Sequence, residues 1–181
     1  MEKTLPSDAN LILIGMPGAG KSTLGVLVAK ILGMDFMDTD LVIQSREGLR
    51  LHEIIRQKGL DAFRELEARY VEGLLVSRTV IATGGSVVYS QRAMESLART
   101  GFILYLSLSL ENLLQRLGNL DERGVVRRPG QDLAALFAER IPLYEAWAHG
   151  TLVCDGLSPE ACLEQLNSLL PSSLRVSEKC R

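Results

Sequence analysis

The sequence contains few of the residues that build metal sites and disulfide frameworks. Its three cysteines, Cys154, Cys162 and Cys180, form an odd number without a C-x-x-C spacing. This pattern predicts reduced thiols and excludes a disulfide framework and a structural zinc site. The two histidines, His52 and His149, lie far apart in the sequence with no other plausible ligand close by. We therefore interpret them as surface or helix-side residues.

An excess of charge and long apolar runs are also missing. The 181 residues carry a net charge of −2, with no basic tail and no block of lysine or arginine. This argues against nucleic acid or an anionic membrane as the main partner. No apolar run approaches the roughly 20 residues of a membrane span, and residues 1–10 lack the apolar core of a signal peptide. We therefore expect a cytoplasmic protein with the composition of a globular domain.

The most informative stretch is 15–23, which fits the G-x-x-x-x-G-K-[ST] pattern of a phosphate-binding P-loop. The apolar run 11–14 precedes it and is typical of a buried parallel strand, while apolar residues at helical spacing follow it up to Gly33. The backbone N–H groups of such a loop and the positive end of its helix bind a triphosphate. We expect Lys21 to reach the β- and γ-phosphates and Ser22 to ligate Mg²⁺. The predicted nucleotide-binding residues here are Gly18, Ala19, Gly20, Lys21, Ser22 and Thr23.

Short apolar stretches alternate with helical patterns along residues 11–170. We predict strands at 11–14, 35–38, 79–82, 102–106 and 151–154, and helices after the P-loop, over 41–76 with breaks at Gly48 and Gly59, over 90–99, from Ser109, over 131–147 and from Ser158. This order predicts a single domain of the α/β class, with a three-layer, doubly wound, five-stranded parallel sheet of the P-loop NTPase type. Ligands in such sheets bind at the carboxyl ends of the strands. We expect residues 1–10 to form a flexible arm and residues 171–181 a loose tail.

An acidic residue that helps to hold Mg²⁺ usually follows another strand in P-loop enzymes. The strands at 79–82 and 102–106 run into no acidic residue, and Asp155 follows a strand expected at the sheet edge. By elimination the acid is Asp38 or Asp40, which are two positions apart at a strand end. Two close carboxylates repel each other unless a cation offsets their charge. The alternative interpretation is that both residues cap the next helix.

Residues 118–131 form a polar segment with three glycines and three arginines, Arg123, Arg127 and Arg128. A loop of this length inside a compact domain is usually functional or disordered. Because it is rich in arginine and carries no apolar stripe that would hold it on the core, we predict a lid that closes over the phosphates. A plain solvated loop is the alternative.

The ordered set of motifs resembles the shikimate kinase family over about residues 11–165. The set consists of the P-loop, Asp-Thr-Asp at 38–40, Phe-Arg at 63–64, Thr-Gly-Gly at 83–85, a lid arginine, and Arg-x-Pro-Leu-Tyr at 140–144. In that family ATP phosphorylates the 3-hydroxyl of shikimate, a small cyclic carboxylate and a precursor of the aromatic amino acids. The resemblance therefore implies ATP and Mg²⁺ as cofactors and shikimate as the substrate.

The resemblance also implies roles for single residues. The implied catalytic residues are Lys21, Asp38 and Arg128, and the implied metal ligands are Ser22 and Asp38. Asp40 is expected to bind the substrate hydroxyls, and Arg64 and Arg140 are expected to bind the substrate carboxylate. Gly84 and Gly85 are expected to offer their backbone N–H groups to the substrate. Arg116 is expected to stack on one face of adenine, and Pro159 is expected to lie on the other face.

Several of these residues have a second interpretation. Planar guanidinium groups on two helices suit a carboxylate, but Arg64 lies three residues after Asp61, which equally suits a surface ion pair. Arg140, near a polar helix end, is open to the same interpretation. Pro159 follows Ser158 at a helix start, where proline is favoured without any ligand.

The chain departs from the family pattern in two places. The family usually has three consecutive glycines where this chain has Gly84, Gly85 and Ser86. The lid arginine is usually followed by proline and two leucines, whereas this chain reads Arg-Arg-Pro-Gly-Gln at 127–131. The first change adds a Cβ beside the substrate, and the second leaves Arg127 as a competitor for the role of lid arginine. We choose Arg128 since it directly precedes the proline.

Three other functions deserve comparison. A sister kinase acting on another small hydroxylated acid or sugar would differ in whether Arg64 and Arg140 converge on one carboxylate. A GTP-binding switch is disfavoured because 121–124 matches its D-x-x-G motif after a helix, not a strand, and no Asn-Lys-x-Asp motif exists. A family member that binds the ligands without catalysing a reaction is disfavoured, because Lys21, Ser22, Asp38 and the arginines of the family pattern are all present. We expect a monomer.

Overall fold

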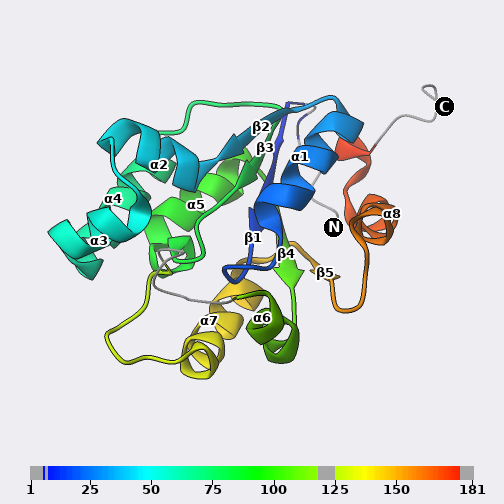
Figure 1. The fold of residues 1–181 in the computed structure, drawn as a ribbon. Helices are drawn as coiled ribbons and strands as arrows, with labels where there is room; N and C mark the ends of the chain where they lie inside the picture. The colour runs from blue at the N-terminus through cyan, green and yellow to red at the C-terminus, as the bar shows by residue number, and fades with distance from the viewer. Residues whose placement is uncertain (1–5, 7, 118–124, 176–181) are drawn as a thin grey trace.

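The computed structural model describes residue 6 and residues 8–117 and 125–175. At its centre is a five-stranded sheet in the order β2-β3-β1-β4-β5, in which every neighbouring pair is parallel (Figure 1). The strands are β1 (Asn10–Ile14), β2 (Asp35–Asp38), β3 (Thr79–Ala82), β4 (Gly101–Ser107) and β5 (Gly150–Val153). The five predicted strands are confirmed to within one residue at each end.

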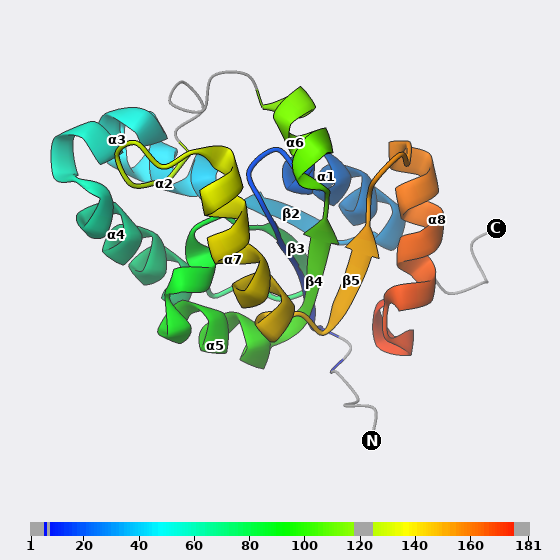
Figure 2. The same cartoon turned by 90° about the horizontal axis from the view of Figure 1, so that it is seen from below.

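Helices connect the strands and cover both faces of the sheet (Figure 2). They are α1 (Lys21–Leu32), α2 (Thr39–Glu47), α3 (Leu51–Lys58), α4 (Leu60–Glu72), η1 (Val87–Tyr89), α5 (Gln91–Thr100), α6 (Leu110–Arg116), α7 (Leu133–Trp147), α8 (Pro159–Leu169) and η2 (Ser172–Leu174). α1 and α8 pack on one face, and α5 and α7 pack on the other. The predicted three-layer, doubly wound α/β class is therefore confirmed, as are the helix breaks at Gly48 and Gly59.

Two hydrophobic clusters hold these layers together. The larger one surrounds β1, whose five residues are all buried, and it extends to the helices on both faces of the sheet. The smaller cluster lies among α2, α3 and α4 and consists of Ile43, Leu51, Ile54, Phe63, Leu66 and Val126. The three helices that share this cluster lie beyond the edge of the sheet that β2 forms (Figure 1). Because β1, β2 and β3 are parallel neighbours, the segments that follow them meet at one edge of the sheet.

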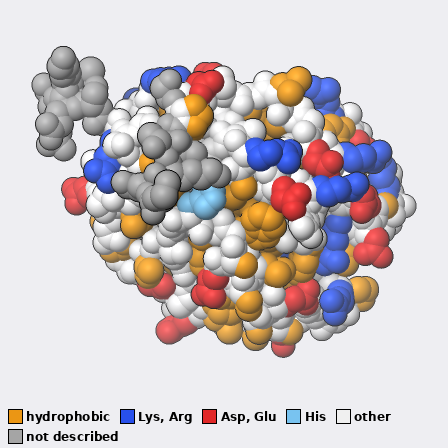
Figure 3. Space-filling model, turned by 180° about the vertical axis from the view of Figure 1, so that it is seen from behind, with side chains coloured by type: hydrophobic (Ala, Val, Ile, Leu, Met, Phe, Trp, Pro, Cys, Tyr) orange, Lys and Arg blue, Asp and Glu red, His pale blue; other side chains and the backbone are white. Residues whose placement is uncertain are grey.

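Charged side chains of both signs lie next to one another on the face shown in Figure 3. Among the ion pairs of the structure, Arg92 pairs with Glu65 at 3.4 Å and with Glu72 at 3.5 Å. None of the helices in the described part of the chain combines the length and the hydropathy that a membrane span requires.

Candidate active site

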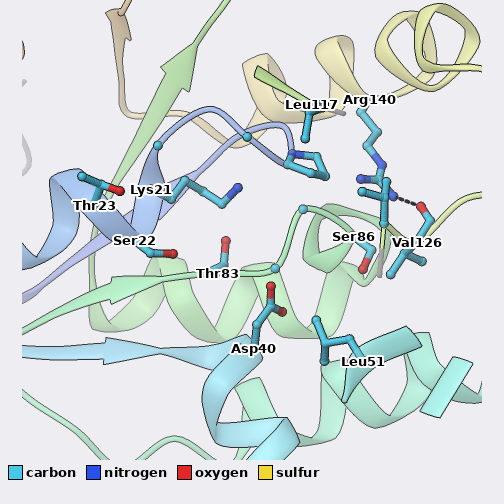
Figure 4. A pocket seen from close by; sticks show the side chains of 16 residues that line it. Lys21, Ser22, Thr23, Asp40, Leu51, Thr83, Ser86, Leu117, Val126 and Arg140 are labelled. Carbon is cyan, nitrogen blue, oxygen red and sulfur yellow. Dashed lines mark hydrogen bonds between the residues drawn. The ribbon is translucent and has the colours of Figure 1, made fainter. Parts of the chain in front are cut away.

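A cavity of about 450 Å³ is lined by the segments that follow β1, β2 and β3 (Figure 4). Its walls include the P-loop, Asp40 and the turn 83–86, with Val126 and Arg140 completing the enclosure. Figure 4 shows Lys21 and Asp40 extending toward this space from two sides. The structure thus brings together most of the predicted phosphate- and substrate-binding residues.

The P-loop conformation depends on its glycines. Gly15 has a φ of 144°, and a Cβ at this position would lie 2.6 Å from the carbonyl oxygen of Leu106. Only glycine allows both this backbone conformation and this close approach to β4. The loop therefore turns directly into α1, whose N-terminus offers its backbone N–H groups to an anion.

Lys21 is buried beside the loop that precedes it. Its Nζ donates hydrogen bonds to the carbonyl oxygens of Gly15, at 2.7 Å, and Met16, at 2.9 Å. Burial lowers the pKa of Lys21 to about 8, although the nearby Asp40 carboxylate acts in the opposite direction. An anionic ligand in the cavity would favour the charged form of the Lys21 ammonium. A triphosphate is such a ligand.

Asp38 uses its two carboxylate oxygens for different contacts. Oδ1 accepts hydrogen bonds from the backbone N–H groups of Asp40 and Leu41, at 2.9 and 3.3 Å, and so caps α2. Oδ2 accepts a hydrogen bond from Ser22 Oγ at 2.6 Å. The helix-capping and metal-binding interpretations are therefore compatible with each other.

The Ser22 and Asp38 oxygens are a donor set that fits Mg²⁺. This cation takes one or two protein ligands and completes its octahedral shell with phosphate oxygens and water. Within the described ranges, no group of three or more His, Cys, Asp or Glu residues is arranged to hold a metal ion. A cation at Ser22 and Asp38 would thus need the nucleotide to complete its shell.

Asp40 lines the cavity opposite the P-loop. Burial raises its pKa to about 6, and the neighbouring Asp38 carboxylate adds to this effect. The charge of Lys21 opposes both influences. A buried carboxylate of this kind gains from a hydrogen-bond donor such as a substrate hydroxyl.

The turn 83–86 is fixed by side chains from two other elements. The backbone N–H of Gly84 donates to Thr39 Oγ1 at 3.1 Å, and Tyr144 donates its hydroxyl to the carbonyl oxygen of Gly85 at 2.6 Å. The Gly84 N–H, which we expected to face the substrate, is thus already bonded to the protein. Gly84 and Gly85 both line the cavity.

Ser86 stands where the family usually has a third glycine, and it forms a buried pair with Glu67 of α4. Ser86 Oγ donates to Glu67 Oε2 at 2.5 Å, and the two residues are only 2% and 1% exposed. Burial raises the pKa of Glu67 to about 7, with a further contribution from Asp40. A Cβ on Gly84 would overlap both Glu67 Oε1 and Asp40 Oδ1, so two carboxylates converge on this glycine.

Glu67 was not among the residues expected from the sequence. Its only sequence signal is its position three residues after Arg64, on the same side of a helix. That signal does not distinguish a buried carboxylate from one at the surface.

Arg140 is completely buried, which excludes the interpretation as a surface ion pair. Its Nη2 donates to the carbonyl oxygen of Val126 and its Nε to the Tyr89 hydroxyl at 3.2 Å. Its Nη1 is buried without a hydrogen-bond partner among the described residues. Nη1 would lie 3.0 Å from a Cβ on Gly85, which places it at the cavity wall.

Arg64 lines an adjoining cavity of about 700 Å³ together with Tyr89 and Ser86. Its Nε, like Nη1 of Arg140, is buried without a hydrogen-bond partner in the described part of the chain. The guanidinium carbons of Arg64 and Arg140 lie 4.2 and 5.2 Å from the centroid of the Tyr89 ring. Arg64 does not line the cavity with the P-loop, but the two cavities share Ser86 as a lining residue and therefore adjoin each other.

The residues expected around adenine line a separate cavity of about 220 Å³. Arg116 and Pro159 both contribute to it, together with Ala19 and Gly20 of the P-loop. Gly20 and Thr23 line both this cavity and the one with Lys21, so the two cavities meet at the P-loop and the start of α1. Pro159 is also the first residue of α8, after the N-cap Ser158, so its role in starting the helix holds as well.

The predicted lid is described only from residue 125, and Arg123 lies outside the described residues. The sequence showed no apolar stripe to hold this segment on the core, but Val125 and Val126 are buried in the two hydrophobic clusters, so two apolar residues hold its described part there. Arg128 is 66% exposed and pairs with Glu139 at 3.6 Å. It does not line the cavity that holds Lys21.

Arg127, its competitor, donates from Nη1 to the carbonyl oxygen of Gln131 at 2.6 Å. Neither arginine is among the residues that line the cavity with Lys21, and the lid itself stays a prediction.

Comparison with known proteins decides the family. Residues 17–170 match the family model described as shikimate kinase. The chain belongs to the shikimate kinase family. It is therefore an ATP-dependent P-loop kinase.

Individual members of the shikimate kinase family agree in length as well as in sequence. A shikimate kinase of Sulfurihydrogenibium is 33% identical over 87% of this chain and 95% of its own length. A shikimate kinase of Xanthomonas campestris is 36% identical over 93% of this chain and 95% of its own length. The solved structure of a shikimate kinase from Acinetobacter baumannii in complex with shikimate matches with a TM-score of 0.82 and 30% identity, over 91% of this chain and 96% of that one.

Proposed function

We propose that this chain transfers the γ-phosphoryl group of ATP to the 3-hydroxyl of shikimate, with Mg²⁺ as cofactor. The observation that carries this proposal is the buried Arg140. It presents Nη1, without a hydrogen-bond partner among the described residues, in the cavity that also contains Lys21 of the P-loop. A buried N–H group of a guanidinium without a hydrogen-bond partner is costly, and a planar carboxylate is the ligand that matches the geometry of the guanidinium.

Arg64 supports a carboxylate ligand over a neutral sugar. Its guanidinium lies against the same Tyr89 ring as that of Arg140, and its Nε is also buried without a partner in the described part. Two cationic forks on separate helices, α4 and α7, fix both the position and the plane of one carboxylate. A sister kinase for neutral sugars would have no use for this pair.

Phosphoryl transfer then requires positioning more than covalent chemistry. Lys21 and the N-terminus of α1 would hold the triphosphate, and Asp40 would accept a hydrogen bond from the substrate hydroxyl. When bound between Ser22 and Asp38, Mg²⁺ would neutralise charge on the β- and γ-phosphates. Adenine would lie between Arg116 and Pro159. A monomeric state and a cytoplasmic location stay predictions from the sequence.

The proposal is tested by coupled ADP release with shikimate and a panel of hydroxy acids and sugars. We expect release that depends on shikimate and stops in excess EDTA, with every other compound at least tenfold poorer in kcat/KM. Lys21→Ala should lower kcat at least tenfold, whereas Lys30→Ala, on the exposed side of the same helix, should not. Preference for another compound in the panel would reassign the substrate.

A further inference from the structure

Tyr89, the last residue of η1, touches both arginines that we assign to the substrate carboxylate. Its ring lies 4.2 Å from the guanidinium carbon of Arg64 and 5.2 Å from that of Arg140. Its hydroxyl accepts a hydrogen bond from Arg140 Nε at 3.2 Å and donates one to Glu139 Oε1 at 2.7 Å. No other residue of the described chain contacts both guanidinium groups through its ring.

We infer that Tyr89 is a positioning residue that holds Arg64 and Arg140 at the spacing needed to bind one carboxylate. The inference rests on the proposed arginine pair and adds a residue that the family motifs do not include. Tyr89 lines the adjoining cavity with Arg64 but not the cavity with the P-loop, and its contacts with the two arginines are the route by which we expect it to act.

The physical reason lies in the charges that Tyr89 separates. Two guanidinium groups near each other repel, and the negative face of an aromatic ring attracts each of them. The hydroxyl adds direction, because it fixes Arg140 at Nε and leaves Nη1 toward the cavity. Glu139, held also by Gln131 Nε2 at 2.8 Å, anchors the hydroxyl from the other side.

The protonation states suit this arrangement. Burial raises the pKa of Tyr89 above its ordinary value, so the hydroxyl stays protonated and can donate and accept at the same time. The hydrogen bond from Tyr89 lowers the pKa of Glu139, which keeps the acceptor charged. The network therefore persists across the pH range of an ordinary assay.

The test compares Tyr89→Phe, which keeps the ring, with Tyr89→Leu, which removes ring and hydroxyl. We expect the KM for shikimate to rise about threefold to tenfold in Tyr89→Phe and about tenfold to hundredfold in Tyr89→Leu. The KM for ATP should stay within about twofold and kcat within about threefold, because the arginine pair binds only the carboxylate. Tyr70→Phe is the matched control, since Tyr70 also donates to a glutamate, Glu47, but outside the site.

A neutral substrate separates positioning from general loosening. With shikimate methyl ester, the Tyr89 variants should match the wild type, because the ester presents no carboxylate for the arginines to bind. An equal loss with acid and ester would overturn the inference, since it would show general damage to the site.

Two arginine variants separate this inference from the proposed function. If Arg140→Ala and Arg64→Ala raise the KM for shikimate but both Tyr89 variants leave it within about twofold, Tyr89 has no positioning role. If the arginine variants also leave it unchanged, the carboxylate pair itself is wrong and the inference is overturned with it. Tyr89→Phe keeps the test decisive if Tyr89→Leu fails to fold.

Discussion

Ser86 shows how a single residue can be accommodated where the family pattern has glycine. Ser86 lines the cavity, and its hydroxyl is bonded to Glu67, with both residues buried. The serine thus supplies the Glu67 carboxylate with a hydrogen-bond donor that a glycine at position 86 would lack. A buried acceptor that loses its donor keeps its desolvation cost.

Ser86→Ala should therefore lower the free energy of unfolding by about 1–3 kcal/mol, measured by urea denaturation. Ser168→Ala is the matched control, because Ser168 also donates its hydroxyl, to the carbonyl oxygen of Gln165, but on the surface. In a Glu67→Gln background the effect of Ser86→Ala should shrink. A loss no larger than that of the control would mean that the Ser86 hydroxyl is not needed.

Glu67 makes stability depend on pH in a defined direction. Its pKa is about 7 in the folded protein against an ordinary value of 4.5, so the folded state binds the proton more tightly than the unfolded state. This stabilisation is complete below pH 4.5 and is lost as the pH rises through 7. Asp40, with a pKa of about 6, acts in the same direction.

Glu67→Gln should consequently flatten the pH profile. Between pH 5 and 8 the wild type should lose up to about 3 kcal/mol of unfolding free energy through Glu67, at roughly 1.4 kcal/mol per pKa unit. The variant should keep only the smaller decline due to Asp40. Thermal or urea unfolding of both proteins at several pH values measures this, and parallel profiles would show that Glu67 titrates normally.

At the scale of elements, the junction between β2 and α2 places Asp38 where it caps α2 and meets Ser22, with which we propose that it binds Mg²⁺. The sequence could predict this junction from a strand end followed at once by a helix start. The P-loop serine added the expectation that an acidic residue lies at such a strand end. The sequence could not predict that one oxygen caps α2 while the other meets Ser22. That division depends on the rotation of the carboxylate in the folded chain.

Asp38→Asn separates the two roles, because asparagine also caps helices but carries no charge. We expect the unfolding free energy to change by less than about 0.5 kcal/mol, while kcat falls at least tenfold, about 1.4 kcal/mol of barrier. Asp38→Ala should show both losses. Full activity of Asp38→Asn at limiting Mg²⁺ would leave Asp38 as a helix cap only.

The segment that carries Arg127 and Arg128 was predicted less well than the junction. Its composition is polar, but Val125 and Val126 pack into the two clusters, and a pair of adjacent valines gives no periodicity to read. Arg128 pairs with Glu139 here, so a role at the phosphates requires that this exposed ion pair opens. Such pairs are weak, with a median near 0–1 kcal/mol, so opening is cheap.

Arg128→Ala should lower kcat about tenfold with an ATP KM within about twofold, the signature of an interaction made mainly in the transition state. Steady-state ADP release measures both constants. If Arg127→Ala behaves in this way and Arg128→Ala does not, the lid arginine is Arg127. If neither variant changes kcat, the segment does not act as a lid.

At the scale of the whole molecule, the parallel topology explains why so much of the site could be predicted. Every strand end that precedes a motif lies at the same edge of the sheet, so the P-loop, Asp38, Asp40 and the turn 83–86 were bound to meet. Tyr89 and Glu67 could not be predicted, because their roles come from contacts between α4, η1 and α7. Such contacts leave no fixed spacing in the sequence.

The central claim is that this edge of the sheet transfers phosphate from ATP to the 3-hydroxyl of a bound carboxylate. The most direct measurement is NMR of the reaction product from ATP, Mg²⁺ and shikimate, with phosphorus-to-proton correlation. The account predicts one new phosphate ester whose phosphorus couples to the proton on carbon 3 of the ring. Free inorganic phosphate alone, or an ester on another hydroxyl, would contradict it.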